Sequence, residues 1–502
     1  MKLRRGITPL FMALALAPWA VAQNNPTPHK HRRYTIVDVG TFGGPQSSYE
    51  VALSLILNTA GATNGTADTT IPDPFAPNCI SDCFVTHAFV WRHGITTELP
   101  SLADSVSTVP LWITDNGTLV GISEKNTLDP LTGLPATDSV LWKHGRVFEL
   151  EGLGGNSSVP AAINNRGQAV GAAANTILDP FASNFPACGS AFPFMFFGSA
   201  TQVRATLWQD GRIRDLGTLG GNDSAAQVVN DSGQIAGESF TNTTPNPVTG
   251  VPTIDPFLWD RGRMIDLGGL GGTCGGSWWI NNRGQVIGQS NLPGDLNFHA
   301  FLWERGRMLD LGTLGGNRSS ARMINNAGEV VGRADIPGSA TRHGFLWKNG
   351  VMTDLGVVAG DPCSTAYGLN SSTQIVGVSS PCGHDGHGFL WENGGPIVDL
   401  NTLVAPGSGI NIIDAWQIND AGEIAAHGLL ANGDLHALVL LPCDEHHPER
   451  CSDYSLIESP DPSSVSTASS SDIASQSKKL AVDPGTIEQR RGVALRRQLP
   501  GS

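Results

Sequence analysis

The sequence contains few charged residues. Asp, Glu, Lys and Arg make up 15% of its 502 residues, against roughly 25% in an ordinary globular protein. Helices at a protein surface need charged outer faces, so this scarcity argues against a largely helical enzyme. Acidic residues outnumber Lys and Arg 45 to 31, for a formal net charge of -14. This negative balance argues against nucleic acid or an anionic membrane as a partner.

Long apolar runs are also scarce. The most prominent covers residues 7–22, follows the basic residues Lys2, Arg4 and Arg5, and ends in Ala-Val-Ala. This arrangement is typical of a cleaved secretory signal peptide, and the run is too short and Pro-interrupted to span a bilayer. We therefore expect a protein without a membrane span that is secreted, either to the extracellular space or to the periplasm.

Common catalytic motifs are missing as well. The sequence has no Gly-x-Ser-x-Gly nucleophile elbow, no phosphate-binding loop and no His-Glu-x-x-His zinc motif. These motifs would have indicated an α/β-hydrolase, a nucleotide-binding enzyme and a metalloprotease. We therefore expect no cofactor, and nothing in the sequence identifies a catalytic residue.

Glycine, in contrast, is abundant, and much of it belongs to an internal repeat. There are 61 glycines, about twice the usual share of roughly 7%. Residues 266–272 read DLGGLGG and residues 310–316 read DLGTLGG, and each is followed by an Ile-Asn-Asn-x-Gly segment. A ladder of tryptophans marks the repeat: Trp91, Trp142, Trp208, Trp259, Trp303, Trp347 and Trp391. Including weaker copies, we count eight units between residues 34 and 441, and such a period indicates stacked supersecondary units.

Each unit divides into four short apolar runs separated by turn-forming residues. Asn-x-x-Gly lies between the second and third runs, and Trp-x-x-Gly separates the fourth run from the next Asp-Leu run. Runs such as residues 300–303 are apolar at every position, as expected for strands buried on both faces. The sequence therefore predicts an all-β protein, a β-propeller of eight four-stranded blades, with seven blades as the alternative.

Residues 299–303 (HAFLW) and 307–316 (RMLDLGTLGG) resemble the extracellular HAF repeat, named for its His-Ala-Phe triplet. The resemblance extends over about residues 34–441, is strongest in repeats four to seven and fades in the first two. The repeats are also similar to kelch repeats, which combine a double glycine with a later Trp. The resemblance implies a secreted bacterial repeat protein with a propeller fold, and it supplies no catalytic residues.

The repeated polar residues have a structural interpretation. Aspartate recurs in the Asp-Leu run at positions 215, 266, 310 and 354, and histidine recurs in the His-Ala-Phe run at positions 87, 299 and 436. A residue present in nearly every blade is a poor candidate for a single active site. We expect these side chains to form hydrogen bonds within each sheet rather than to hold a metal or perform catalysis.

Loop lengths indicate where binding occurs. Two connections of each repeat keep their length and lie on one face of the disc. The loop between the third and fourth runs, on the opposite face, is long in the first four repeats and short in the others. Long loops on a rigid scaffold commonly carry binding. The candidate ligand contacts on this basis are Phe181, Phe185, Phe194, Phe196 and Trp278, although the phenylalanine-rich loop could instead be a lid packed on neighbouring blades.

The eight cysteines are interpreted as disulfide partners, since an exported protein meets an oxidising environment. Sequence proximity pairs Cys79 with Cys83, Cys363 with Cys382, and Cys443 with Cys451, and leaves Cys188 and Cys274 for a fourth bond. Two segments also have metal-ligand spacing: Cys382 with His384 and His387, and the residues between Cys443 and Cys451. Disulfides with bystander histidines are the preferred interpretation, so no metal site is predicted.

The expected organisation is a signal peptide (1–22), a linker (23–33), the propeller (34–441) and a disordered Ser-, Pro- and Asp-rich tail with a small Cys loop (442–502). We expect a monomeric binding module whose partner is an extracellular polysaccharide or protein. The alternative is a polysaccharide hydrolase or lyase with an acidic site in the propeller funnel. Fold alone does not choose between the two.

Overall fold

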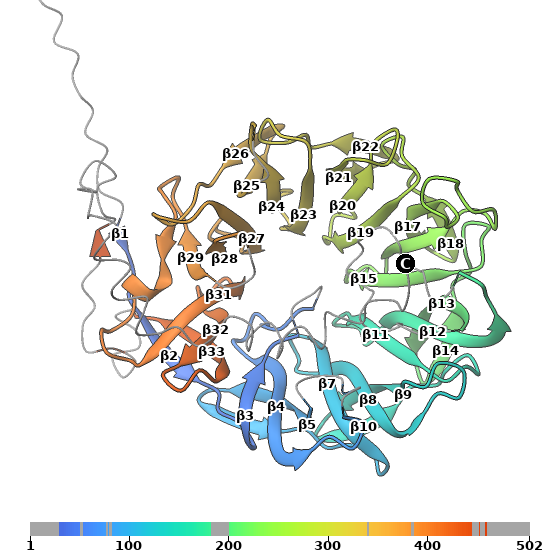
Figure 1. Cartoon of the computed structure of the whole chain (residues 1–502), viewed down its shortest axis with the longest axis horizontal. Coiled ribbons are helices and arrows are strands. Elements are labelled where there is room, and N and C mark those ends of the chain that lie inside the picture. Colours follow the sequence, from blue (N-terminus) through green and yellow to red (C-terminus); the bar gives the residue numbers. More distant parts are fainter. Residues whose placement is uncertain are drawn as a thin grey trace, which may run out of the picture.

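The protein is an eight-bladed β-propeller (Figure 1). The computed structural model describes residues 30–50, 54–76, 79, 83–181, 200–338, 341–382, 386–443, 451 and 457–458. Eight four-stranded antiparallel sheets surround a central channel, and one edge strand of each sheet lies nearest the axis. The predicted fold class is therefore confirmed, with eight blades rather than seven.

The blades follow one another along the chain, and within blades 1 to 7 the strands run in sequence from the axis outward. Blade 1 consists of β3 (Gly43–Ser48), β4 (Thr63–Pro72), β5 (Phe84–Arg92) and β6 (Ile95–Glu98). Blade 2 consists of β7 (Ser105–Ile113), β8 (Leu119–Leu128), β9 (Pro135–Lys143) and β10 (Arg146–Glu149). Blade 3 consists of β11 (Ser158–Ile163), β12 (Ala169–Leu178), β13 (Thr201–Gln209) and β14 (Arg212–Asp215). Blade 4 consists of β15 (Ser224–Val229), β16 (Ile235–Phe240), β17 (Ile254–Asp260) and β18 (Arg263–Asp266).

The second half repeats the pattern. Blade 5 consists of β19 (Gly275–Ile280), β20 (Val286–Asn291), β21 (Phe298–Glu304) and β22 (Arg307–Asp310). Blade 6 consists of β23 (Ser319–Ile324), β24 (Val330–Asp335), β25 (Arg342–Lys348) and β26 (Val351–Asp354). Blade 7 consists of β27 (Cys363–Leu369), β28 (Ile375–Ser380), β29 (His387–Trp391) and β30 (Val398–Asp399), followed by the short 3-10 helix η3 (Leu400–Thr402).

Blade 8 joins the two ends of the propeller. Its inner strands are β31 (Ile410–Ile418), β32 (Ile424–Leu430) and β33 (Leu435–Pro442), and its outermost strand is β2 (Tyr34–Asp38) from the start of the domain. Strand β2 runs antiparallel to β33, with Tyr34 opposite Pro442 and Asp38 opposite Leu438. This pairing closes the ring. Outside it, β1 (Lys30–His31) in the expected linker pairs with β34 (Ile457–Glu458) in the expected tail.

The two uniform connections are tight turns, as predicted. The last two residues of each Trp-x-x-Gly segment have positive φ, as at Arg305 (φ 51°) and Gly306 (φ 83°), and they form the centre of a type I′ hairpin turn. The last position of the Asn-x-x-Gly turns also has positive φ, for example 76° at Gly284, which favours glycine. Blade 7 has Thr373 at this position with φ 61°, so its backbone is strained there.

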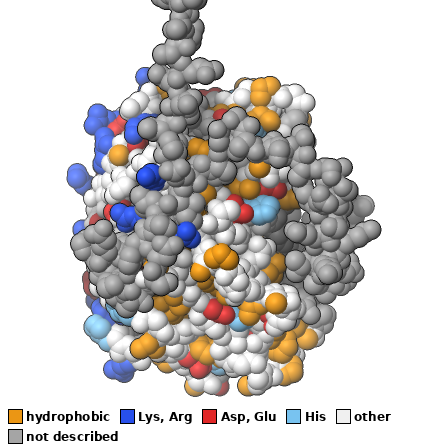
Figure 2. Space-filling view, turned by 90° about the vertical axis from the view of Figure 1, so that its left-hand side faces the viewer, with side chains coloured by type: hydrophobic (Ala, Val, Ile, Leu, Met, Phe, Trp, Pro, Cys, Tyr) orange, Lys and Arg blue, Asp and Glu red, His pale blue; other side chains and the backbone are white. Residues whose placement is uncertain are grey.

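The core lies between the blades, where each sheet packs against its neighbours. The phenylalanine of the His-Ala-Phe run is completely buried in five blades: Phe89, Phe257, Phe301, Phe345 and Phe389. Within the described residues, no helix has the length and apolar character needed to cross a membrane. Viewed from the side of β1 and β2, the surface shows Lys and Arg along one border, with apolar side chains scattered over the rest (Figure 2).

Candidate functional site: the central cavity

A cavity of about 350 Å³ occupies the central channel at the face that carries the Asn-x-x-Gly turns. All eight blades contribute to it. Blade 1 does so through residues between β3 and β4, and the other blades do so through the end of the innermost strand and the first residues of the following turn. This is the face on which the two connections of constant length lie. The binding prediction based on loop length concerns the opposite face. The cavity is therefore a second candidate site, and the sequence analysis did not find it because its lining consists of repeated turn residues.

A ring of asparagine side chains links the turns around this cavity. Asn281 is representative: its Oδ1 accepts the backbone N–H groups of Arg283 and Gln285, each at 3.0 Å. Its Nδ2 donates to the backbone oxygen of Asn325 in the next blade at 3.0 Å. The same interblade bond is made by Asn58, Asn164, Asn230, Asn325, Asn370 and Asn419. Blade 2 interrupts the ring, because Thr114 occupies this position and its hydroxyl bonds within its own turn.

The next residue of each turn forms the exposed rim of the cavity. These rim residues are Thr59, Asp115, Asn165, Asp231, Asn282, Asn326, Ser371 and Asp420. In most of these residues the backbone N–H donates to the side chain of the rim residue in the next blade. Asn326 Oδ1, for example, accepts the Asn282 N–H at 3.0 Å. The carboxylates take part in the same bonding: Asp231 accepts from Asn165 N at 3.3 Å and from Asn282 Nδ2 at 3.0 Å. The rim therefore offers amide, hydroxyl and carboxylate groups in fixed positions.

The cavity floor is apolar and aromatic. Trp112 of blade 2 and Trp279 of blade 5 stack with ring centroids 5.2 Å apart and an interplanar angle of 29°. They belong to blades three positions apart in the ring, so they meet because the ring is closed. Leu55, Ile163 and Met323 are among the apolar residues around them. A polar rim above an aromatic floor suits a ligand with hydroxyl groups and an apolar face.

A second group of buried polar side chains lies where blade 8 meets blade 1. His427 Nε2 accepts the Tyr49 N–H at 2.9 Å, and Nδ1 lies 3.2 Å from Asp414 Oδ2. These contacts set the tautomer of the neutral ring, with the proton on Nδ1. Burial raises the pKa of the neighbouring Glu50 carboxyl, and His427 acts in the opposite direction.

The predicted ligand contacts are only partly described. Phe181 is half-buried and packs edge-on against Phe240, with ring centroids 6.4 Å apart, as a lid residue would. Trp278 is 2% exposed, and its neighbour Trp279, which the sequence analysis did not select, lines the cavity. Phe185, Phe194 and Phe196 lie outside the described residues. The remaining ligand contacts therefore stay predictions.

Parts of the long loops are strand. In blades 1 to 3 the second strand is ten residues long and extends beyond the blade before the loop begins. Each extension ends at a buried aspartate whose Oδ1 accepts the N–H two residues later: Phe75 on Asp73, Leu131 on Asp129, and Phe181 on Asp179. Each of these aspartates is followed by a proline in the sequence, and the Asp-Pro pairs at 73–74, 129–130 and 179–180 are thus turn-forming elements. The tips leave Ile71, Leu128 and Ile177 more than half exposed.

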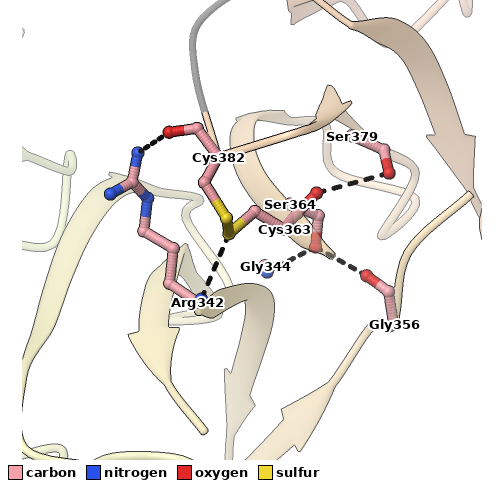
Figure 3. The surroundings of a disulfide bond; sticks show 7 residues. All are labelled: Arg342, Gly344, Gly356, Cys363, Ser364, Ser379 and Cys382. Carbon is pink, nitrogen blue, oxygen red and sulfur yellow. Dashed lines mark hydrogen bonds between the residues drawn. A yellow bond between two sulfur atoms is a disulfide. The ribbon is translucent and has the colours of Figure 1, made fainter. Parts of the chain in front are cut away.

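Three predicted disulfides are present: Cys79–Cys83, Cys363–Cys382 and Cys443–Cys451. Cys274 is also disulfide-bonded, while its predicted partner Cys188 lies outside the described residues. Figure 3 shows Cys363–Cys382, whose Cys363 Sγ lies 3.5 Å from the Arg342 backbone nitrogen. His387 Nδ1 lies 2.9 Å from Asp361 Oδ2, and His384 lies outside the described residues.

The repeated histidines and aspartates form hydrogen bonds, as expected. Asp310 Oδ1 accepts the Gly312 N–H at 2.8 Å and lies 2.9 Å from His299 Nδ1, and His343 with Asp354 repeats this arrangement. His87 pairs in the same way with Glu98. Within the described part of the chain, no group of three or more His, Cys, Asp or Glu residues is arranged to hold a metal ion.

Comparison with known proteins yields structural similarity alone. No protein-family model and no curated protein matches the sequence. Among solved structures, the chain is similar to the β-propeller domain of the Trilobed protease from Pyrococcus furiosus, with 13% identity and a TM-score of 0.36 over 62% of this chain and 83% of that one. It is also similar to oligogalacturonate lyase from Vibrio parahaemolyticus, with 9% identity and a TM-score of 0.38 over 82% of this chain and 98% of that one. An ulvan lyase of polysaccharide lyase family 25 aligns at 8% identity and a TM-score of 0.35 over 82% of this chain and 95% of that one. Similarities this low carry no functional argument, and the assignment as a propeller rests on the sheets themselves.

Proposed function

We propose that this protein is a secreted binding module and that the central cavity receives its ligand. The observation that carries the proposal is the exposed ring of amide and carboxylate groups above the Trp112–Trp279 stack. Fixed hydrogen-bonding groups around an aromatic surface match the chemistry of a sugar, which has hydroxyl groups at its edges and C–H groups on its faces. An extracellular polysaccharide is therefore the preferred partner.

Export supports this choice of partner. The features of residues 1–22 are those of a signal peptide, and the disulfides suit an oxidising compartment. The resemblance to extracellular HAF repeats points the same way, since the His-Ala-Phe segment at 299–301 retains that pattern on β21.

The loop-bearing face is a second candidate surface. The exposed apolar tips Ile71, Leu128 and Ile177 come from three consecutive blades and project from the ends of β4, β8 and β12. Exposed apolar groups that recur on neighbouring blades suit contact with a protein or with the apolar part of a ligand.

The enzyme alternative places catalysis in the funnel. The rim carboxylates Asp115, Asp231 and Asp420 belong to non-adjacent blades, and each accepts hydrogen bonds from its neighbours in the rim. Burial raises the pKa of Glu50, but Glu50 does not line the cavity.

The mature chain should be screened against glycans and cell-wall polymers, with retention and product release both scored. Ala327→Trp places a large ring at the cavity mouth, where Ala327 is exposed, and removes no existing side-chain contact. We expect at least a tenfold loss of retention, equivalent to about 1.4 kcal/mol. Val351→Trp, on an exposed outer strand, is the matched control. Retention equal in both variants would refute binding in the cavity.

A further inference from the structure

Three arginines of blade 6 gather beside blade 7. Arg322 lies on the innermost strand β23, Arg333 lies on β24 opposite Ser320, and Arg342 begins β25 opposite Asp335. All three side chains are half-buried. The Arg342 guanidinium donates to the Cys382 carbonyl of blade 7 at 3.4 Å, beside the Cys363–Cys382 bond (Figure 3).

The charge of the cluster is not neutralised by an ion pair within the described residues. The Nε atoms of Arg322 and Arg342 are buried and have no hydrogen-bond partner among the described residues. Within that part of the chain, no ion pair involves any of the three arginines. The absence is notable in a protein with 45 acidic residues and 31 Lys and Arg residues. Buried charge without a counterion is costly, so such a cluster is expected where a ligand provides the opposite charge.

The electrostatic effects agree with this geometry. Burial, together with the positive charges of Arg322 and Arg342, lowers the pKa of Arg333 to about 10. Burial also lowers the pKa of Arg322. Tyr367 opposes these effects at both Arg322 and Arg333, and Asp335 opposes them at Arg333. Asp414 of blade 8 already accepts the His427 backbone N–H at 2.9 Å. The three cations therefore repel one another in the free protein.

We propose that Arg322, Arg333 and Arg342 form a binding site for an oxyanion, namely a carboxylate, sulfate or phosphate group. The guanidinium group presents several N–H donors in a plane, which match the oxygens of such a group and bind it in bidentate fashion. The oxyanion is either a free ion or the acidic group of a larger molecule. This site differs from the central cavity, which none of the three arginines lines, and it does not depend on the proposed function.

The test compares thermal unfolding and calorimetric binding with three probes: sodium sulfate, sodium glucuronate and neutral glucose. Ionic strength is held constant with NaCl, and the probes are kept at low millimolar concentration, where general salting-out is small. We expect sulfate and glucuronate to raise the unfolding temperature of the wild type and glucose to leave it unchanged. A stronger effect of glucuronate would identify an acidic sugar as the source of the anion, and a stronger effect of sulfate would identify a free oxyanion.

The variant Arg333→Gln should lower anion affinity at least tenfold and raise the unfolding temperature of the ligand-free protein, because it removes cation repulsion. Arg307→Gln, at an exposed position on β22, should change neither quantity. Arg342→Gln serves as a second variant should Arg333→Gln fail to fold, and Ala327→Trp should retain anion binding. The proposal is overturned if neither anion stabilises the wild type, if the arginine variants keep the full effect, or if Arg333→Gln destabilises the ligand-free protein.

Discussion

Pro256 of blade 4 faces Gly275 of blade 5 at a seam where most other blades form a hydrogen bond. In six seams a Ser or Thr hydroxyl on the innermost strand accepts a backbone N–H from the third strand of the preceding blade. Examples are Ala300 N to Ser319 Oγ and Ala205 N to Ser224 Oγ, both at 2.9 Å; the others use Ser47, Thr108, Ser158 and Ser364. Pro256 has no N–H, and a Cβ at position 275 would lie 3.0 Å from its Cδ. The two departures from the repeat thus compensate each other.

This relationship predicts strong coupling between the two positions. Gly275→Ser should destabilise the protein by about 1 kcal/mol, because its hydroxyl meets a ring without a donor. Pro256→Ala alone should cost about 1–3 kcal/mol, because it exposes a buried N–H with no acceptor. The double variant restores the bond found in the other seams and should be close to wild type. Chemical denaturation of all four proteins measures the coupling, and additive losses would contradict it.

The interruption of the asparagine ring at Thr114 predicts a stabilising substitution. Thr114→Asn should place an amide where it can reach the backbone oxygen of Asn164, as Asn58 reaches Thr114 at 3.0 Å, and should raise stability by about 1 kcal/mol. Asn281→Ala should do the opposite, with a loss of about 2–3 kcal/mol, because it leaves two buried turn N–H groups and a carbonyl unpaired. Thermal unfolding measures both effects. An unchanged midpoint for Asn281→Ala would show that the ring contributes little.

Blade 4 also departs from the repeat at Asp255, which replaces the histidine of the His-Ala-Phe run. Burial, followed by the charge of Asp266, raises the pKa of Asp255 from 3.8 to about 6. Because the folded state holds this proton more tightly, the contribution of Asp255 to stability is complete below about pH 4 and is lost as the pH rises through 6. Asp255→Asn should therefore stabilise the protein at pH 7.5, by at most about 3 kcal/mol, and have little effect at pH 4. Denaturation at both pH values provides the test, and equal effects would exclude the raised pKa as the cause.

The pair His436 and Asp38 joins the two ends of the propeller and has its own pH dependence. Burial opposes both charges, but the 2.8 Å contact between them prevails, so the pKa of His436 is raised and that of Asp38 is lowered. The contribution of His436 is complete below pH 6.5 and is lost as the pH rises through its raised pKa. That of Asp38 is complete above pH 3.8 and is lost as the pH falls through its lowered pKa.

The pair should therefore stabilise the closed ring most between about pH 4 and 6.5. His436→Gln should cost about 1 kcal/mol at pH 5.5 and less at pH 9. His299→Gln, in a pair within one blade, is the matched control for closure. The hydrogen-exchange rate of the β2 amides should rise in His436→Gln and not in His299→Gln. Equal rates in the two variants would show that the His436–Asp38 pair does not hold the ring closed.

The blade architecture could be predicted from the sequence because its causes are local. A tight turn needs residues that accept positive φ, and Arg305-Gly306 or Asn281 with Gly284 supply them within a few positions. The strands between the turns, the number of blades and the three short-range disulfides follow from spacing along the chain. The repeated Asp and His residues could be identified as structural because they recur in nearly every blade. In the structure Asp310 bonds locally with His299 and Gly312.

The candidate sites were decided by the closed ring. Trp112 of blade 2 and Trp279 of blade 5 are far apart in the sequence. They stack only because the eight sheets form a closed ring around the channel. The asparagines appeared as turn residues in the sequence, and their interblade bonds exist because the turns meet at one end of the channel. Arg322, Arg333 and Arg342 follow no repeat pattern, and their shared position depends on side-chain packing between blades 6 and 7. Local hydrogen-bonding chemistry therefore determined the repeating unit, whereas the cavity and the unpaired cations arose from contacts that only closure of the propeller creates.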